Sequence, residues 1–176
     1  MKNKIAPTNN ERVMADDEFI VSKTDATGRL TYGNRIFIDY SGYSEQELLG
    51  QQHNIIRHPD MPRAVFHLLW STLKSGNEFF GYVKNMSKDG SFYWVFANVT
   101  PSYSNSGANV KDISGFFSVR RKPDPGKLRI IDALYKEMLV AEQAAGTSAA
   151  IAAGTKVLMD VVNKTGKDYR EFILSI

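Results

Sequence analysis

The strongest constraint on the fold is a set of three strand-like runs in the middle of the chain, Phe79–Asn85, Phe92–Thr100 and Ile113–Arg120. Each run is rich in aromatic and β-branched residues, which favour extended structure. The tight turn Lys88–Ser91 separates the first two runs, and the Ser-, Asn- and Gly-rich stretch Ser102–Asn109 separates the last two. Consecutive strands joined in this way pair antiparallel, so this part of the chain predicts a β-meander.

Two shorter strands precede the meander. Residues Phe19–Thr24 and Arg29–Tyr32 flank the turn signal Asp25–Gly28 and predict a hairpin. Helix-forming segments fill the space between hairpin and meander: a short one after Asn34 at an N-cap position, a capping box at Ser44–Glu47, and the apolar pattern Pro62–Lys74. This order predicts an α+β fold, in which a five-stranded antiparallel sheet has short helices on one face.

The two ends of the chain differ in character from the middle. Residues 1–15 are polar and without periodicity, so we expect a flexible leader before a folded domain at 16–122. After the break Pro123–Gly126, residues 123–176 show helical apolar spacing, as in Leu128, Ile131 and Tyr135. A helical tail with apolar stripes is not stable alone, so we expect it to pack on the sheet domain, on itself or on another chain.

Composition excludes several classes of function. The chain has no cysteine, which removes disulfides, thiolate metal sites and cysteine nucleophiles. The net charge of +3 is small and scattered, so no nucleic-acid footprint is indicated. No membrane-spanning run or secretory signal is visible, which makes the cytoplasm the expected location. Motifs of hydrolases, nucleotide-binding loops and metalloproteases are missing, so we expect a protein that is not an enzyme.

The densest polar segment is Gln51–Pro62, and it permits two interpretations. In the first it is a hydrogen-bonded connector, in which Asp60 caps the following helix and Arg57 pairs with a carboxylate. In the second it is the rim of a pocket, where Arg57 and the helix N-terminus receive an anionic ligand such as a pyrophosphate. The residues alone favour the first interpretation and leave the second open.

Asn85 is the informative polar residue of the first meander strand. It alternates with Phe79, Gly81 and Val83, so its amide is expected to face the same interior. A buried amide needs hydrogen-bond partners, which a heterocycle with paired donors and acceptors would supply. The many aromatic residues of the three strands are most simply explained as core.

The order of elements and the phrases Gly42–Gly50 and Lys88–Trp94 resemble a PAS sensory domain. The string His53–Pro62 (HNIIRHPDMP), followed by Trp70, Gly81–Asn85 and Tyr93–Val95, is more specifically similar to the N-terminal PAS domain of bacterial aerotaxis receptors. The resemblance runs from about Asp16 to Arg121. It implies a domain that binds FAD non-covalently and reports redox state to a chemotaxis-type signalling module.

The resemblance also implies a set of cofactor-binding residues. Arg57, His58 and Asp60 match the segment on which flavin binding depends in the family, and Asn85 matches a strand amide that hydrogen-bonds the flavin ring. Phe79 stands where family members usually have tryptophan. Phenylalanine keeps a stacking face but lacks the indole N–H donor. The full set is Asn34, His53, Asn54, Arg57, His58, Asp60, Trp70, Phe79 and Asn85.

Alternative functions follow from the same resemblance. Light-oxygen-voltage domains form a flavin–cysteinyl adduct at the position of His53, and a chain without thiols cannot do so. A haem-binding domain would need an axial ligand, for which His67 is the candidate. Two further hypotheses for the function are a cofactor-free interaction module and a flavin-dependent enzyme. For output we expect the tail to dock on a second copy of the chain, as a homodimer, or on a chemotaxis-type signalling protein.

Overall fold

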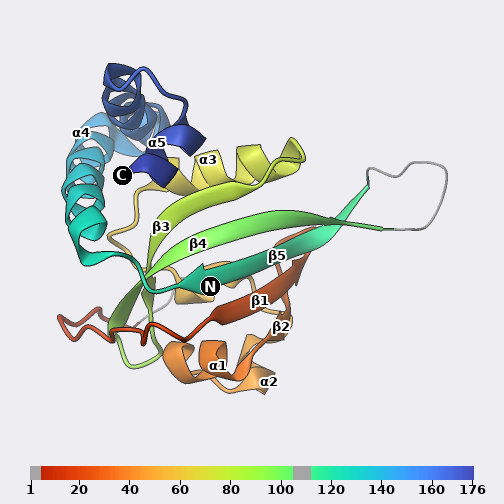
Figure 1. Ribbon diagram of the computed structural model, residues 1–176. Coiled ribbons are helices and arrows are strands. Elements are labelled where there is room, and N and C mark those ends of the chain that lie inside the picture. The colour runs from red at the N-terminus through yellow and green to blue at the C-terminus, as the bar shows by residue number, and fades with distance from the viewer. Residues whose placement is uncertain (1–4, 105–111) are drawn as a thin grey trace.

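A computed structural model describes residues 5–104 and 112–176 of the chain (Figure 1). Five strands and a series of helices follow the predicted order. The stretch Ser102–Asn109 was predicted as a loop, but Ser102 and Tyr103 are the last two residues of β4. Residues 105–109 of this stretch lie outside the described residues. The elements are β1 (Ile20–Asp25), β2 (Leu30–Gly33), α1 (Arg35–Ser41), α2 (Glu45–Leu48), the 3-10 helix η1 (His53–Ile56), α3 (Arg63–Lys74), β3 (Phe79–Met86), β4 (Phe92–Tyr103), β5 (Ile113–Arg121), α4 (Pro125–Lys164) and α5 (Tyr169–Ser175).

The five strands form one antiparallel sheet in the order β2-β1-β5-β4-β3. The predicted meander is confirmed as β3-β4-β5, and the predicted hairpin as β1-β2. Strand β5 pairs with β1 as well, so the two parts of the sheet join at its centre, and β3 is left as an edge strand. The α+β prediction, with a five-stranded antiparallel sheet and helices packed against it, is therefore confirmed.

Asn34 is a structural link between strand β1 and helix α1. Its side-chain oxygen accepts hydrogen bonds from the backbone N–H groups of Phe37 (3.0 Å) and Val21 (3.0 Å), and its amide nitrogen donates to the carbonyl of Phe19. The first of these bonds is the predicted N-cap. The predicted capping box at Ser44 is also present, with Glu47 as its partner.

The segment expected to be a flexible leader contacts the sheet domain from residue 8 onwards. Backbone hydrogen bonds join Thr8 to Gly90, and Arg12 to Phe92. The Arg12 guanidinium donates to the carbonyls at the end of α1, and Met14 is buried. Backbone pairing and one buried apolar side chain thus hold a segment that its polar composition alone would leave free.

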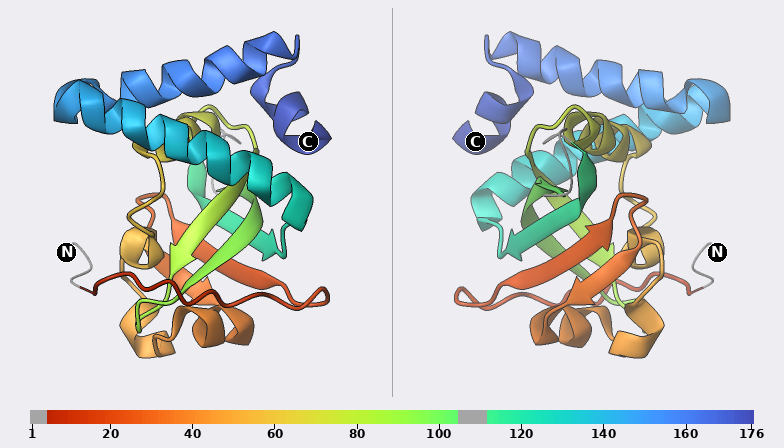
Figure 2. Two further views of the ribbon diagram at one scale, coloured as in Figure 1. Left: turned by 90° about the vertical axis from the view of Figure 1, so that its left-hand side faces the viewer. Right: turned by 90° about the vertical axis from the view of Figure 1, so that its right-hand side faces the viewer.

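The tail folds back on itself and lies beside α3 and the β3 edge (Figure 2). Helix α4 is broken at Gly146, whose φ of 73° is open to glycine at no steric cost, and its two segments form a helical hairpin. The hydroxyls of Tyr135 and Tyr169 donate to the carbonyls of Tyr82 (2.9 Å) and Phe80 (3.1 Å). Two tail tyrosines therefore satisfy carbonyls on the open edge of the sheet.

The N-terminus of α3 is capped by the tail. No side chain from its own sequence caps this helix, so the expectation that Asp60 does so is wrong. Instead the backbone N–H groups of Arg63 and Ala64 donate to the two carboxylate oxygens of Glu142 on α4, both at 2.9 Å. The side chain of Glu142 is buried beneath Gly154 of the returning segment, where a Cβ would have no room. Pro62, at the cap position, has no polar side chain to offer, which explains why a distant carboxylate takes this role.

None of the helices in the described part of the chain combines the length and the apolar character needed to cross a lipid bilayer.

We predict that Glu142→Gln destabilises the protein by about 1–3 kcal/mol, because its amide would face one of the two buried backbone donors with a second donor. Urea unfolding measures the change. Glu137→Gln is the matched control, since Glu137 lies on the same helix and is exposed; it should change the free energy of unfolding by less than about 0.5 kcal/mol. Equal stability of the two variants would remove Glu142 from this role.

Candidate functional site

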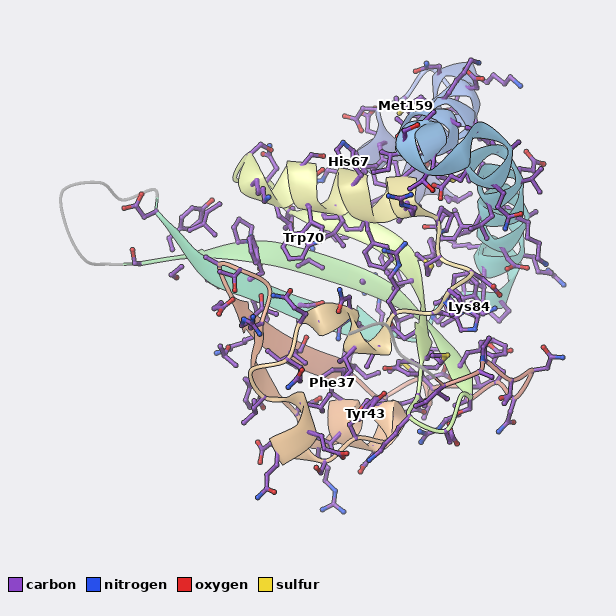
Figure 3. All side chains as sticks on the ribbon, turned by 180° about the vertical axis from the view of Figure 1, so that it is seen from behind. Phe37, Tyr43, His67, Trp70, Lys84 and Met159 are labelled. Atoms are coloured by element: carbon purple, nitrogen blue, oxygen red, sulfur yellow. The ribbon has the colours of Figure 1, made fainter. Side chains whose placement is uncertain are left out.

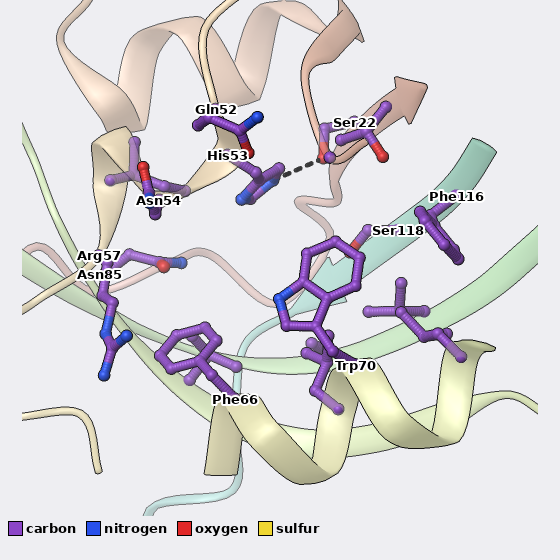
Figure 4. A pocket seen from close by; sticks show the side chains of 18 of the residues that line it. Ser22, Gln52, His53, Asn54, Arg57, Phe66, Trp70, Asn85, Phe116 and Ser118 are labelled. Atoms are coloured by element: carbon purple, nitrogen blue, oxygen red, sulfur yellow. Dashed lines mark hydrogen bonds between the residues drawn. The ribbon is translucent and has the colours of Figure 1, made fainter. Parts of the chain in front are cut away.

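A cavity lies between the sheet and the segment formed by η1 and α3 (Figure 4). Its volume is about 130 Å³, which at about 30 Å³ per liquid water is room for about four waters. Close-packed interiors leave few voids of this size, so the cavity is a feature to be explained. Its lining is Ser22, Thr24, Gly28, Gln52, His53, Asn54, Ile56, Arg57, Phe66, Leu69, Trp70, Leu73, Val83, Asn85, Ala97, Val99, Phe116, Ser118 and Arg120.

Trp70 and Phe66 form the α3 wall of the cavity. Figure 3 shows Trp70 in the space between α3 and the sheet. Its indole meets the ring of Phe116 on β5 edge-on, with ring centres 5.3 Å apart. Gly28 lies under the indole, with a φ of 83° and only 3.1 Å between a would-be Cβ and the ring. The turn after β1 therefore comes close to Trp70 because it lacks a side chain there.

Asn85 points into this cavity from β3, as the strand alternation predicted (Figure 4). The residue is 3% exposed, and its amide nitrogen has no hydrogen-bond partner among the described residues. The hydroxyls of Thr24 and Ser118, which also line the cavity, are buried without partners as well. A buried donor left unpaired costs about 1–3 kcal/mol, so three such groups around one cavity indicate a site for a polar ligand.

Arg57 lines the same cavity and is half-buried. Its guanidinium donates to the carbonyl of Met61 (3.0 Å) and lies 4.2 Å from the centre of the Phe66 ring. It forms no ion pair with a carboxylate in the described ranges, so the expected pairing of Arg57 is not found. Burial lowers the pKa of Arg57, and the charge of Glu142 opposes that shift.

His53 is held at the cavity wall by Arg120 and Ser22. The Arg120 guanidinium is 2.6 Å from His53 Nε2, and the Ser22 hydroxyl is 3.1 Å from the same atom. A guanidinium can only donate, so His53 Nε2 carries no proton. Burial, reinforced by the Arg120 charge, lowers the pKa of His53 to about 3. The ring is therefore neutral at ordinary pH.

The cavity is electropositive. Its lining contains the guanidiniums of Arg57 and Arg120, a neutral His53 and no aspartate or glutamate. The amides of Gln52, Asn54 and Asn85 add polarity without charge. This arrangement favours a ligand that carries negative charge or several acceptor atoms.

Five of the nine residues predicted as cofactor-binding come together here: His53, Asn54, Arg57, Trp70 and Asn85. The structure does not bring Asn34, His58, Asp60 and Phe79 to the cavity. Asn34 caps α1, and Phe79 stacks on Tyr169 of the tail with ring centres 5.7 Å apart. The helix N-terminus proposed for an anion is taken by Glu142.

His58 and Asp60 have other partners. His58 is 2% exposed; its Nδ1 accepts from the backbone N–H of Asp60 (3.1 Å), and its ring packs edge-on against Phe92. The exposed carboxylate of Asp60 pairs with Lys84 at 3.0 Å. His67, the candidate haem ligand, is exposed and does not line the cavity.

Sequence reasoning missed Ser22, Ser118 and Arg120. The signal was the two-residue period of β5: Phe116, Ser118 and Arg120 share the face that alternates with Phe117 and Val119. A serine and an arginine at core positions of a central strand indicate a polar interior. Interpreting the aromatic residues of that strand simply as core overlooks this signal.

A second hollow lies on the other side of the sheet, where α4 and the N-terminal segment border Trp94 and Lys84. Its volume is about 790 Å³. None of the buried unpartnered polar atoms of the described residues belongs to its lining. The cavity at Asn85 is therefore the better candidate site.

Comparison with known proteins finds one family. A family model described as "PAS fold" matches residues 30–116. The aerotaxis receptor of Escherichia coli (strain K12) is 40% identical over 131 residues, which are 74% of this chain and 25% of the receptor. The nitrogen fixation regulatory protein of Klebsiella pneumoniae is 30% identical over 108 residues, 58% of this chain and 22% of that protein. The chain thus spans about a quarter of the length of these curated relatives.

Solved structures with the same fold include light-oxygen-voltage domains. The dark structure of the blue-light photoreceptor Aureochrome1 LOV has a TM-score of 0.55 and 19% identity, over 68% of this chain and 85% of that chain. A light-oxygen-voltage domain studied with a flavin analogue has a TM-score of 0.55 and 18% identity, over 68% of this chain and 86% of that chain. At these identities the likeness shows a shared fold.

We predict that His58 makes stability fall in acid. Burial and then Lys84 lower the pKa of His58 from 6.5 to about 4, so the unfolded chain binds the extra proton first. The contribution of His58 to the free energy of unfolding is complete above pH 6.5 and is lost as pH falls toward 4. About 2 kcal/mol of this contribution is lost between pH 7 and 5. Urea unfolding at both pH values measures the loss.

The variant that tests this assignment is His58→Asn, whose amide oxygen can still accept from the Asp60 N–H. It should reduce the acid-induced loss by the same amount, whereas His67→Asn, at an exposed position on α3, should leave it unchanged. An acid limb that is the same in both variants would contradict the assignment.

Proposed function

We propose that the domain whose residues 30–116 match the family model described as "PAS fold" is a sensor that binds FAD non-covalently and reports the redox state of the flavin to a signalling partner. Residues 16–122 form the sensor in this proposal, and residues 123–176 form the output. The single observation that carries it is the unpartnered amide of Asn85 in the cavity. The protein would act in the cytoplasm and would not be an enzyme.

The residues present fit a flavin. Aromatic and aliphatic side chains from α3 and from the sheet border the cavity on both sides, as a flat ring requires. Unpartnered polar groups at Asn85, Ser118 and Thr24 suit the paired donors and acceptors of a heterocycle. The 40% identity to the aerotaxis receptor and the fold shared with a domain studied with a flavin analogue support the same choice.

When bound, a flavin supplies the reversible uptake of electrons and protons. The chain's own residues hold and read it. Trp70 and Phe66 fix the ring plane and exclude water, and Asn85 offers both a donor and an acceptor, so its amide can match either protonation state of a facing atom. With no thiol in the chain, the site forms no cysteinyl adduct.

Arg57 is the residue that favours FAD or FMN over riboflavin in this proposal. It is half-buried beside the exposed Asn54 of η1, so a ligand that extends from the cavity would pass its guanidinium. A planar guanidinium binds phosphate oxygens with paired hydrogen bonds. Among the described residues, one guanidinium nitrogen of Arg57 donates a hydrogen bond, to the carbonyl of Met61.

Helix α3 connects the cavity to the tail. It places Trp70 and Phe66 at the ligand and its first two backbone N–H groups at Glu142. A shift of α3 against the sheet therefore changes the contact that holds α4. We expect the tail to pass this change to a second copy of the chain or to a chemotaxis-type signalling protein.

The flavin content of the purified protein tests this proposal directly. Protein purified from flavin-replete cells should show flavin absorption and release FAD on denaturation, and Asn85→Leu should lower FAD affinity about tenfold or more, because it removes the buried hydrogen-bonding amide. Asn98→Leu is the matched control: Asn98 lies on β4, bonds Glu78 and does not line the cavity. A folded wild-type protein that holds no flavin and takes up none would favour the cofactor-free module, and haem absorption would favour the haem-binding one.

The affinities for FAD, FMN and riboflavin separate a contact with the phosphate from contacts with the ring. Arg57→Met keeps the aliphatic stem against Phe66 and should weaken FAD and FMN about tenfold while changing riboflavin affinity less than about twofold. Arg35→Met, on the exposed face of α1, should change none of the three affinities. Equal loss for all three ligands would mean that Arg57 acts through the cavity shape and not through the phosphate.

A further inference from the structure

Arg120 is the most unusual charged residue of the domain. It lies on the central strand β5, opposite Ile20 on β1 and Ala97 on β4, and is 5% exposed. Its Nη2 donates to the Ser22 hydroxyl (3.0 Å) and to His53 Nε2 (2.6 Å). Its Nη1 is buried and has no hydrogen-bond partner among the described residues.

No carboxylate of the described residues forms an ion pair with this guanidinium. The groups around it are neutral: the hydroxyls of Ser22 and Tyr93, the ring of Phe37 at 5.7 Å, and His53. Burial lowers the pKa of Arg120 to about 10, which leaves it charged at neutral pH. A buried charge without a counter-charge is strongly destabilising, so the apo domain contains an unmatched cation at its centre.

A bracing role does not account for Arg120. The two side chains to which it donates, Ser22 and His53, are already hydrogen-bonded to each other at 3.1 Å. Neither would be left unpaired by loss of the guanidinium. Arg120 lines the cavity, and Ser118, two residues away on the same strand face, has an unpartnered hydroxyl there as well.

We propose that Arg120 is the residue that recognises the charge-bearing edge of the ligand ring at the β5 wall of the cavity. The proposal rests on the proposed function and extends it. The pyrimidinedione edge of a flavin carries carbonyl oxygens and a ring nitrogen, and this edge takes up negative charge when the flavin is reduced. Arg120 therefore binds the oxidised ring through its acceptors and binds the reduced ring more tightly, so that it raises the reduction potential of the bound flavin.

The ligand also resolves the electrostatics of the apo domain. His53 cannot neutralise Arg120, because the neutral imidazole carries no negative charge: its Nε2 only accepts a hydrogen bond from the guanidinium, and the pKa of His53 is lowered to about 3. Asn85 and Ser118 contribute dipoles and no charge. An anionic or acceptor-rich ring edge in the cavity would supply the negative charge that none of these groups offers, and this assigns the two arginines different tasks: Arg57 at the phosphate and Arg120 at the ring.

The experiment compares Arg120→Met, Arg120→Lys and Arg121→Met with the wild type. Arg121 is the matched control, because it is the next residue on β5, is exposed, and lies over Phe96 outside the cavity. Dissociation constants are measured for FAD in air and for FAD reduced with dithionite under anaerobic conditions. Urea unfolding of the flavin-free proteins gives a second readout that does not depend on the ligand.

For Arg120→Met we expect the dissociation constant to rise about tenfold for oxidised FAD and about a hundredfold for reduced FAD. The tenfold change in their ratio corresponds to a fall of about 30 mV in the two-electron potential. The flavin-free variant should unfold at the same or a higher urea concentration than the wild type, because an unmatched buried charge has been removed. Arg120→Lys should restore part of the preference for reduced FAD, and Arg121→Met should match the wild type.

The failures are distinguishable. If wild-type protein binds FAD but Arg120→Met leaves both dissociation constants unchanged, the role of Arg120 is overturned and the proposed function stands. If flavin-free Arg120→Met unfolds at lower urea with an unchanged ratio of the two constants, Arg120 is a structural brace. If the wild type binds FAD in neither state, both proposals are overturned.

Discussion

A single carboxylate on the tail caps the helix that borders the cavity. Glu142 accepts hydrogen bonds from the first two backbone N–H groups of α3, a helix whose own preceding residue is proline and offers no cap. The helix dipole concentrates positive charge at this end, so a buried carboxylate is favoured there, and the absent side chain of Gly154 lets the returning tail segment cover it. The sheet domain and the tail are therefore joined through a buried polar contact, beside the tyrosine hydroxyls that close the edge of β3.

The cavity follows the opposite rule. Where the tail interface satisfies its buried polar groups, the cavity leaves Asn85, Ser118, Thr24 and one nitrogen of Arg120 without partners. Each such group costs free energy in the apo domain, and the sum is large beside the marginal stability of a domain of this size. A ligand that formed hydrogen bonds with these groups would offset that cost.

Much of the fold could be predicted from local patterns. Strand alternation, the Asn34 cap, the Ser44 capping box and the break before the tail all depend on neighbours in the sequence, and each is found in the structure. The cavity was predicted in part, because Asn85 follows strand parity and Arg57 lies in a dense polar segment. Contacts between distant segments could not be predicted this way: Glu142 is separated from α3 by the whole meander, and Asp60 was the natural local choice for the cap. Arg120 was missed because an arginine at the end of a strand is ordinarily solvent-exposed, and only the sheet order places it at the centre.

The strength of the Glu142 contact suits a switch. Hydrogen bonds to a charged group contribute about 1.5–3 kcal/mol each, and coupling free energies between sites are typically about 1–3 kcal/mol. The loss of one of the two bonds to α3 therefore falls within the range of a coupling free energy, whereas both together hold the tail in one arrangement. Helix α3 is stiff over its 12 residues, so a displacement at Trp70 moves its N-terminus as well. Since Glu142 can accept from Arg63 and Ala64 only while that end stays in place, the position of α3 at the cavity and the position of the tail are linked in one equilibrium.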